Sequence, residues 1–287
     1  MSLLSPPLEA FVAIAETKTV HGAALAIGLT QTGVTQRIRA LESQLSATLF
    51  IRSRRGMMLT PEGEALYRYC QAATDLEGLA LSQITGAAKK TSVRVQIIGP
   101  TSVMTSRVVP RCASVMQKFG NLFMGFEVMD EESRVDKLRS GEAQLALISH
   151  KSVAKEMESK RLKPEHYVLV GSNKWRTRKL NEILETEKII DFNSSDDMSF
   201  SYLKSFGLLA RAKTERHYVN NNDALIHLLK LGIGYGVLTR EVAEPYLKRG
   251  DIVLLNGGKV FESPIALAWY PRPQMPAYFQ ALVDAIV

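Results

Sequence analysis

Apolar residues recur at spacings of three and four along the first 45 residues, and this spacing predicts three short helices. The first ends near residues 17–19, and the second ends at Gly28, which tolerates a left-handed turn. The third opens at Thr30 or Gln31, both suited to a helix start. We predict that its buried stripe consists of Val34, Ile38, Leu41 and Leu45. The opposite face carries hydrogen-bonding and cationic side chains, namely Thr32, Thr35, Gln36, Arg37 and Arg39.

A helix, a tight turn and a second helix with such a face predict a helix-turn-helix whose second helix lies in a DNA groove. Two short strands follow between residues 49 and 61 and are joined by a basic turn, Arg54 to Gly56, as in a wing. Thr60 and Pro61 then open a long helix that runs to about Gly86. Its apolar stripe fits pairing with another helix or packing on its own domain. Residues 87–92 are predicted to form a hinge.

Beyond the hinge, strand and helix patterns alternate, which predicts an α/β fold with parallel strands and crossover helices. Predicted strands lie at 93–98, 123–129, 144–149, 167–171, 189–192, 218, 235–238, 252–255 and 264–270. Predicted helices lie at 101–119, 133–139, 179–186, 199–206, 223–231 and 277–287. The chain crosses between two lobes near Ser149-His150 and near 257–263. A hinged clamshell with a ligand cleft between the lobes is therefore expected.

The composition is that of an ordinary globular protein, with 287 residues, 46% hydrophobic and 23% charged. This length predicts two or three units. The sequence has no leader pattern and no apolar run of membrane-spanning length, so a cytoplasmic location without membrane contact is expected. Cys70 and Cys112 lack the spacing of a zinc site or a disulfide framework. They are expected to be reduced structural residues, with a redox-sensing thiol as the alternative.

Positive charge gathers where the helix-turn-helix and wing are predicted. The whole chain carries a net charge of +7, and residues 1–60 carry six cations against three acids. Five of those six cations lie between Arg37 and Arg55. Such a cluster favours phosphate through counterion release, and beside a helix-turn-helix this outweighs the alternative of a solvated basic face.

The N-terminal stretch resembles the winged helix-turn-helix of LysR-type transcriptional regulators. The residues that carry the resemblance are Ala23-Ala24, Leu29-Thr30-Gln31, Val34-Thr35-Gln36, Ile38 to Glu42, Leu45, Leu49-Phe50, Arg52, Arg55-Gly56, Leu59-Thr60-Pro61 and Gly63. The sequence departs from the family at Gly33, where alanine is usual, and at His21-Gly22. Because glycine weakens a helix by about 1 kcal/mol relative to alanine, these departures put the base preference in question rather than the fold.

The resemblance implies four segments. These are a DNA-binding domain at 1–60, a dimerising linker helix at 61–86, a hinge at 87–92 and an effector domain at 93–287. The effector domain would be a two-lobed, periplasmic-binding-protein-like α/β structure, with lobe I at about 93–149 and 264–287 and lobe II at about 162–256. Implied partners are double-stranded DNA, a small-molecule effector, a second copy in a homodimer or homotetramer, and RNA polymerase.

The expected DNA contacts follow from the two motifs. Gln31, Thr32, Thr35 and Gln36 are the candidates for base edges. Thr30, Arg37 and Arg54 are the candidates for phosphates, and the cations Arg39, Arg52 and Arg55 complete the expected DNA-binding set.

The expected effector contacts lie in turns that follow strands. Thr101 and Ser102 in one lobe, and Asn220 and Asn221 in the other, begin helices whose free amides attract a carboxylate. Thr101 and Ser102 have the alternative role of a simple helix cap. The acidic pairs Asp130-Glu131 and Asp196-Asp197 suit a cationic group if they face the cleft, and are otherwise solvated surface. Ser149, His150 and Ser195 complete the expected set.

These groups together fit an amino acid or organic acid effector. Residues 191–193 and 217–219 are faintly similar to the LysR-type branch that responds to lysine and arginine and controls their export. The regulated gene would then be a divergent neighbour, such as an amino-acid exporter.

The alternative function is a small-molecule-binding protein or enzyme with an incidental helical N-terminus. The five histidines are scattered, and no nucleophile elbow or metal-ligand pair occurs, so no catalytic residue, metal or cofactor is expected. The glycine-rich stretch Gly232 to Gly236 ends a helix and opens a strand, which is the reverse of a nucleotide-binding loop. It is interpreted as a helix C-cap and turn.

Overall fold

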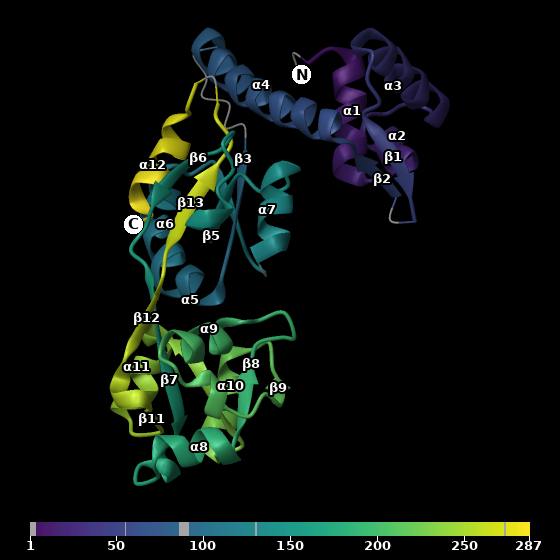
Figure 1. Ribbon diagram of the computed structural model, residues 1–287. Coiled ribbons are helices and arrows are strands. Elements are labelled where there is room, and N and C mark those ends of the chain that lie inside the picture. The colour runs from purple at the N-terminus through teal and green to yellow at the C-terminus, as the bar shows by residue number, and fades with distance from the viewer. Residues whose placement is uncertain (1–3, 55, 86–91, 130, 273) are drawn as a thin grey trace. The chain divides into compact units, whose positions relative to one another are not determined.

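Backbone contacts divide the chain into two units, Met1–Arg161 with Ala266–Val287, and Leu162–Ile265. The computed structural model describes residues 4–54, 56–85, 92–129, 131–272 and 274–287. The first unit holds the N-terminal helices, a long helix and an α/β lobe, here called lobe I, and the second unit is a separate α/β lobe, lobe II (Figure 1). Within the described ranges, no helix combines the length and apolar character that a membrane crossing needs.

The N-terminal part is a three-helix cluster with a two-stranded hairpin. Its elements are α1 (Pro6–Thr17), α2 (Val20–Ala26), α3 (Gln31–Leu45), β1 (Phe50–Ser53), β2 (Gly56–Leu59) and α4 (Pro61–Thr85). Phe11 is fully buried and its ring centroid lies 5.2 Å from that of Phe50, so the first helix is packed against the hairpin. The predicted elements are confirmed here, but Leu45 is 45% exposed and lies outside the core. The predicted hinge, 87–92, lies outside the described residues except for Ser92.

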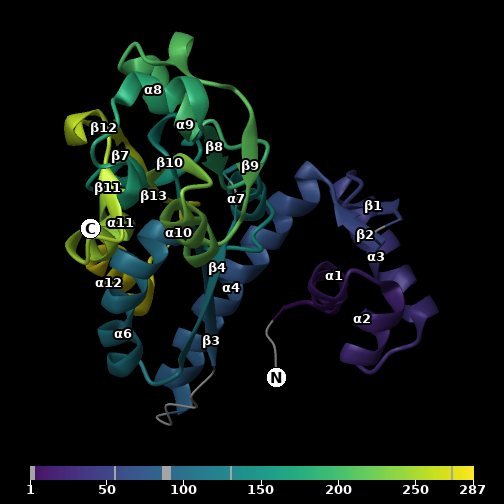
Figure 2. The ribbon, with the colours of Figure 1, turned by 90° about the horizontal axis from the view of Figure 1, so that it is seen from below.

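Lobe I is a five-stranded sheet in the order β4-β3-β5-β13-β6. Its elements are β3 (Val93–Gly99), α5 (Thr101–Val103), a π-helical segment (Met104–Val108), α6 (Val109–Lys118), β4 (Leu122–Val128), α7 (Glu131–Arg139), β5 (Leu145–Ser149), β6 (Glu158–Arg161), β13 (Ile265–Trp269) and α12 (Ala277–Ala285). Helices α6 and α12 pack side by side (Figure 2). The predicted helix 101–119 is present, but its π-helical segment was not predicted. Pro110 cannot donate the amide hydrogen bond that regular α spacing requires, and Val109 N–H reaches back to Met104 instead.

Lobe II is a second sheet, in which the strand order is β11-β7-β10-β8-β9 and β12 also pairs with β7. Its elements are β7 (Glu165–Ser172), α8 (Leu180–Thr186), β8 (Lys188–Asp191), α9 (Met198–Ser205), β9 (Arg216–Tyr218), α10 (Asn222–Leu231), β10 (Gly234–Thr239), α11 (Arg240–Lys248), β11 (Ile252–Leu254) and β12 (Val260–Ser263). One core cluster, which includes Leu225 and Leu229, lies on one face of this sheet, and another, which includes Tyr202 and Tyr235, lies on the other.

The predicted parallel strands are present, and each sheet also contains antiparallel pairs. Strands β3, β4 and β5 are parallel, as are β8, β9 and β10, but β13 with β6 and β7 with its three neighbours are antiparallel. Strands β6 and β12 and helix α11 were not predicted. The expected crossing at 257–263 is wrong in part, because Val260–Ser263 pairs with β7 and belongs to lobe II.

Candidate functional site

The third helix is set on the domain by its own sequence. Val34, Ile38 and Leu41 are buried at helical spacing, and the Thr30 side chain accepts a hydrogen bond of 3.1 Å from Gly33 N–H. At the other end of α3, Glu42 accepts a 2.8 Å hydrogen bond from the Leu49 amide and so ties the helix to the start of the hairpin. The helix is therefore fixed at both ends, and its face opposite the apolar stripe is left to solvent.

The predicted DNA-binding residues of α3 divide into two groups. Gln31, Thr32, Gln36 and Arg39 are exposed. Thr35 is half-buried, and its hydroxyl donates to the Gln31 carbonyl at 2.8 Å.

Two residues of this region that were predicted to contact phosphates, Thr30 and Arg37, also make bonds within the domain. Thr30 is exposed but its hydroxyl caps α3, and the Arg37 guanidinium donates to the Pro6 carbonyl at 3.3 Å. Capping leaves the Thr30 hydroxyl oxygen engaged, and the Pro6 contact directs Arg37 toward the start of α1.

The hairpin carries two exposed cations and is fixed at its base by the backbone. Arg52 and Arg54 are exposed, and Arg55 lies outside the described residues. Met57 N–H donates to the Lys18 carbonyl at 2.8 Å. Gly56 has a φ of +103°, and a Cβ placed there would lie 2.5 Å from the Lys18 carbonyl oxygen. Only glycine fits this position, so the hairpin is clamped to the C-terminal end of α1.

Lobe I places its candidate effector residues at the carboxyl ends of β3 and β5. Thr101 and Ser102 are half-buried, and Pro100 occupies the N-cap without a side-chain cap bond, so capping does not account for the Thr101 side chain. The His150 Nε2 atom lies 2.8 Å from a guanidinium nitrogen of Arg161, and its Nδ1 is buried without a described partner.

The other three candidate effector residues of lobe I are Ser149, Asp130 and Glu131. The Ser149 hydroxyl accepts the Lys151 amide at 3.4 Å, so it caps the following short turn. Asp130 and the side chain of Glu131 lie outside what the structure describes.

In lobe II the candidate residues mostly hold their own loops. Asn221 caps α10 by accepting the Ala224 amide at 3.0 Å, and Asn220 is exposed. Ser195 donates both its amide and its hydroxyl to the Asn193 side chain, at 2.9 and 2.7 Å. Asp197 is exposed and accepts from the Ser201 hydroxyl at 3.4 Å. Asp196 accepts the amides of Phe192 and Met198, so its charge is turned inward to the loop backbone.

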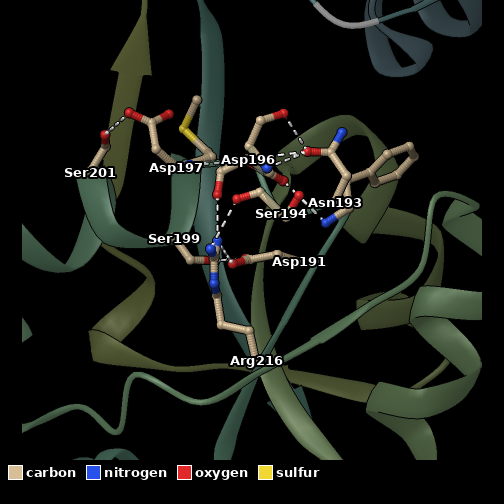
Figure 3. A network of polar contacts seen from close by, with 11 residues as sticks. Asp191, Asn193, Ser194, Asp196, Asp197, Ser199, Ser201 and Arg216 are labelled. Carbon is tan, nitrogen blue, oxygen red and sulfur yellow. Dashed lines mark hydrogen bonds and ion pairs between the residues drawn. The ribbon is translucent and has the colours of Figure 1, made fainter.

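A buried polar cluster at the carboxyl end of β8, which Arg216 reaches from the start of β9, was not among the predicted sites (Figure 3). Asp191 is only 3% exposed, and its carboxylate accepts hydrogen bonds from the Ser199 hydroxyl at 2.5 Å and from Arg216 at 3.0 Å. The same guanidinium donates to the carbonyls of Asp196, at 2.7 Å, and Ser194, at 3.1 Å. It also lies over the rings of Phe200 and Tyr218. The Arg216 side chain thereby holds the 192–197 loop to the end of the sheet.

Burial dominates the electrostatics of this cluster. It raises the pKa of Asp191, while hydrogen bonds from Ser199 and Arg216 act in the opposite direction. Burial also raises the pKa of the neighbouring Tyr235 phenol, and the Asp191 charge adds to the increase. A sequence signal for this site exists, because Asp191 directly follows the apolar pair Ile189-Ile190 and, once buried, needs a cationic partner. The partner lies 25 positions further along the chain, and no local pattern points to it.

Local geometry agrees with the interpretation of the glycine-rich stretch and of the two cysteines. Gly232 caps α10 with a φ of +79°, so the glycine-rich stretch is a helix end and turn. Cys70 and Cys112 are free and buried, and burial raises the pKa of each thiol to about 11. Among the described residues, no three His, Cys, Asp or Glu side chains form a group that could hold a metal ion.

Family comparisons agree with both parts of this architecture. The model of the bacterial regulatory helix-turn-helix proteins of the lysR family matches residues 7–64. The model of the LysR substrate binding domain matches residues 88–287, more than half of the chain. The chain belongs to the LysR family. It is thus a LysR-type transcriptional regulator with an effector-binding domain.

Individual relatives of this LysR-family chain are distant but extend along most of its length. The transcriptional regulator AbaB of Streptomyces antibioticus is 27% identical over 258 residues, which cover 86% of this chain and 85% of that protein. The crystal structure of ArgP from Mycobacterium tuberculosis has a TM-score of 0.82 at 21% identity, covering 99% of this chain and 96% of that one. Full-length LysG from Corynebacterium glutamicum with bound effector Arg has a TM-score of 0.76 at 19% identity, with the same two coverages. At these identities the structural likenesses establish the fold.

Proposed function

We propose that this regulator binds operator DNA through α3 and the β1–β2 hairpin. The observation that carries the proposal is the pairing of exposed Gln31, Thr32, Gln36 and Arg39 on α3 with two exposed hairpin cations. Gln31, Thr32, Thr35 and Gln36 read base edges in the major groove. Phosphates are held by Arg39, Arg52, Arg54 and Arg55. Thr30 and Arg37 act mainly inside the domain, where they cap α3 and contact Pro6.

The proposed assembly is a homodimer, formed through α4 and able to pair into a tetramer, that presents two recognition helices to the two halves of an operator. The regulator acts in the cytoplasm and contacts RNA polymerase at the promoter. A divergent neighbouring gene is the first operator to test. In this proposal the chain regulates transcription and has no enzymatic reaction of its own.

The proposed effector is a small amino acid or organic acid that contacts the loops at the carboxyl ends of the strands. Thr101, Ser102, Ser149 and His150 are the contacts in lobe I, with Asp130 and Glu131 as acidic neighbours. Ser195, Asp197, Asn220 and Asn221 are the contacts in lobe II. The LysG protein of Corynebacterium glutamicum carries Arg as its effector, which favours screening basic amino acids first. In this chain, however, Asp191 and Asp196 already bind internal donors, which leaves Asp197 as the exposed acid of that loop.

Gel-shift titrations on an operator duplex and a random duplex, each at two salt concentrations, test the DNA proposal. Arg54→Ala should weaken binding to both duplexes and reduce the dependence of log affinity on log salt by about one. Arg211→Ala is the matched control, because Arg211 is an exposed lobe II arginine, and it should leave both values unchanged. Gln36→Ala should reduce the preference for one base over the others, at a single base pair, by about 1–3 kcal/mol. Equal, salt-insensitive affinity for both duplexes would favour the alternative of a small-molecule-binding protein or enzyme.

A thermal-shift screen tests the effector proposal. Lysine, arginine, neutral amino acids and aromatic acids are added at the same concentration, and the true effector class raises the melting temperature by mass action. A shift with an aromatic acid and none with lysine or arginine would exclude a basic effector.

A further inference from the structure

The turn that follows α7 in lobe I is seated on the DNA-binding region within the first unit. Gly141 of this turn has a φ of +77° and is buried, and a Cβ placed on it would come within 3.0 Å of the Tyr67 ring on α4. A side chain at this position would be strained by the backbone and crowded by the ring, so glycine permits the close approach.

Two polar side chains of α4 reach the backbone of the same turn. The Gln71 amide donates to the Gly141 carbonyl at 2.9 Å, and Gln144 of lobe I donates to the same oxygen at 2.9 Å. The Arg68 guanidinium donates to the Arg139 carbonyl and lies 4.2 Å from the centre of the Tyr270 ring. Because both contacts are made to backbone carbonyls, they depend on the backbone of the turn and on the α4 side chains rather than on the side chains of the turn.

The next residue of the turn reaches α1. The Glu142 carboxylate pairs with the Lys18 ammonium at 2.8 Å. Lys18 ends α1 in a left-handed conformation, and its carbonyl accepts the Met57 amide at the base of the hairpin. A continuous chain of contacts therefore runs from lobe I through Glu142, Lys18 and Met57 to the hairpin that carries Arg52 and Arg54.

We propose that the turn Arg139–Glu142 is a latch through which lobe I controls the hairpin of the DNA-binding region. When the turn is seated, the two α4 contacts hold it in place, and the Glu142–Lys18 pair supports the end of α1 and with it the base of the hairpin. When the turn leaves, the hairpin loses part of this support and must be ordered by DNA. The proposal rests on the DNA-binding function proposed above, and extends it by naming the contact that transmits the state of the effector domain.

A zero-length carbodiimide cross-link tests the seated contact in the full-length protein. The reagent should join the Lys18 ammonium and the Glu142 carboxylate as an amide, with loss of water, and mass spectrometry should find the joined peptides in the monomer band of a denaturing gel. The Lys137–Glu127 pair of lobe I, also at 2.8 Å, is the internal positive control. Capture of the control pair without the Lys18–Glu142 pair in the monomer band would overturn the proposal.

Hydrogen exchange tests the mechanical coupling without DNA. Glu142→Gln and, separately, Gln71→Ala should speed exchange of the Met57 amide by about two- to fivefold, the range expected for loss of one exposed ion pair or hydrogen bond. Glu215→Gln removes one exposed acid from lobe II and should leave that amide unchanged. Unchanged exchange of Met57 in both latch variants would overturn the proposal.

Operator binding separates failure of the latch from failure of the DNA-binding function. The ratio of operator affinity to random-duplex affinity should fall about two- to fivefold in Glu142→Gln relative to Glu215→Gln. If the parent protein prefers no duplex, the proposed DNA function fails, and the exchange experiment still decides the coupling. If the parent prefers its operator, and Glu142→Gln and Glu215→Gln show the same affinity ratio as the parent, the latch alone is refuted.

Discussion

Removal of the Arg216 guanidinium should destabilise lobe II strongly, because, among the residues that the structure describes, it leaves the Ser199 hydroxyl as the only side chain hydrogen-bonded to the buried Asp191 carboxylate. The side-chain exposures are 15% for Arg216 and 2% for Asp191, so solvent screens this pair weakly. Breaking one partner of such a pair costs about 3–5 kcal/mol. Arg216→Met retains an unbranched apolar side chain beside Phe200, so most of this cost reports the lost charge and hydrogen bonds.

The penalty should depend on pH in a defined direction. Burial already raises the pKa of Asp191, and loss of Arg216 removes an influence that lowers it. The folded state then binds a proton more tightly than the unfolded state, whose Asp pKa is about 3.9. Unfolding free energy therefore falls as pH rises from about 4 through the folded pKa, by up to about 1.4 kcal/mol per pH unit. Arg216→Met should lose more stability at pH 8 than at pH 5.

Urea unfolding followed by Trp175 fluorescence measures this effect locally, because Trp175 belongs to the lobe II core. The chain has two tryptophans, so a Trp269→Phe background removes the signal of the other unit. Asp191→Asn with Arg216→Met is the control, since it removes both charges and should recover part of the loss. A penalty below about 1 kcal/mol at pH 8, or one that is equal at both pH values, would contradict a buried and mutually dependent pair.

Three further variants or reagents probe the remainder of the chain. Gly63→Ala should destabilise the DNA-binding region by about 1–3 kcal/mol and lower its melting temperature, because the added Cβ would lie 2.2 Å from the Leu49 carbonyl oxygen. Gly120→Ala is the control, because its Cβ enters open space and the change should be near neutral. Thr30→Ala should cost about 1 kcal/mol by loss of the α3 cap, which Thr30→Ser restores; equal melting curves for the two variants would count against the cap. The two cysteines should react with a disulfide reagent at pH 8 only as fast as the protein unfolds, because burial raises the pKa of each thiol to about 11 and keeps it protonated; rapid labelling of the native protein would disprove this.

Local patterns were sufficient to predict the DNA-binding region. Helical spacing in α1 to α3, the cap at Thr30 and the turn at Gly28 depend on neighbours within a few residues, and the structure reproduces all of them. Leu45 is the exception, because periodicity places it on the apolar face while the helix ends there, beyond the core.

The missed elements depend on distant partners or carry mixed signals. Strand β6 has the polar sequence Glu-Ser-Lys-Arg and exists because it pairs with β13, more than 100 residues later. Strand β12 similarly depends on β7, and α11 contains Pro245, which argues against a helix.

The internal bonds of the candidate effector loops could not be predicted from the sequence, for a related reason. An acid after a strand looks available to a ligand, but Asp196 satisfies nearby backbone amides, as short acidic side chains in turns commonly do. The dominant charge pair of lobe II joins β8 to β9, and this pairing becomes visible only when the sheet is assembled.

The 192–197 loop keeps its shape largely without help from its most exposed side chains. Its shape is imposed by Asn193 and Asp196 acting on main-chain amides and by one arginine acting on main-chain carbonyls. The exposed side chain of Ser194 is absent from these bonds, although its carbonyl takes part. The Ser194 side chain can therefore be exchanged while the surrounding backbone stays in place. A library randomised at Ser194 alone is accordingly a compact way to vary the surface chemistry of this loop without refolding it.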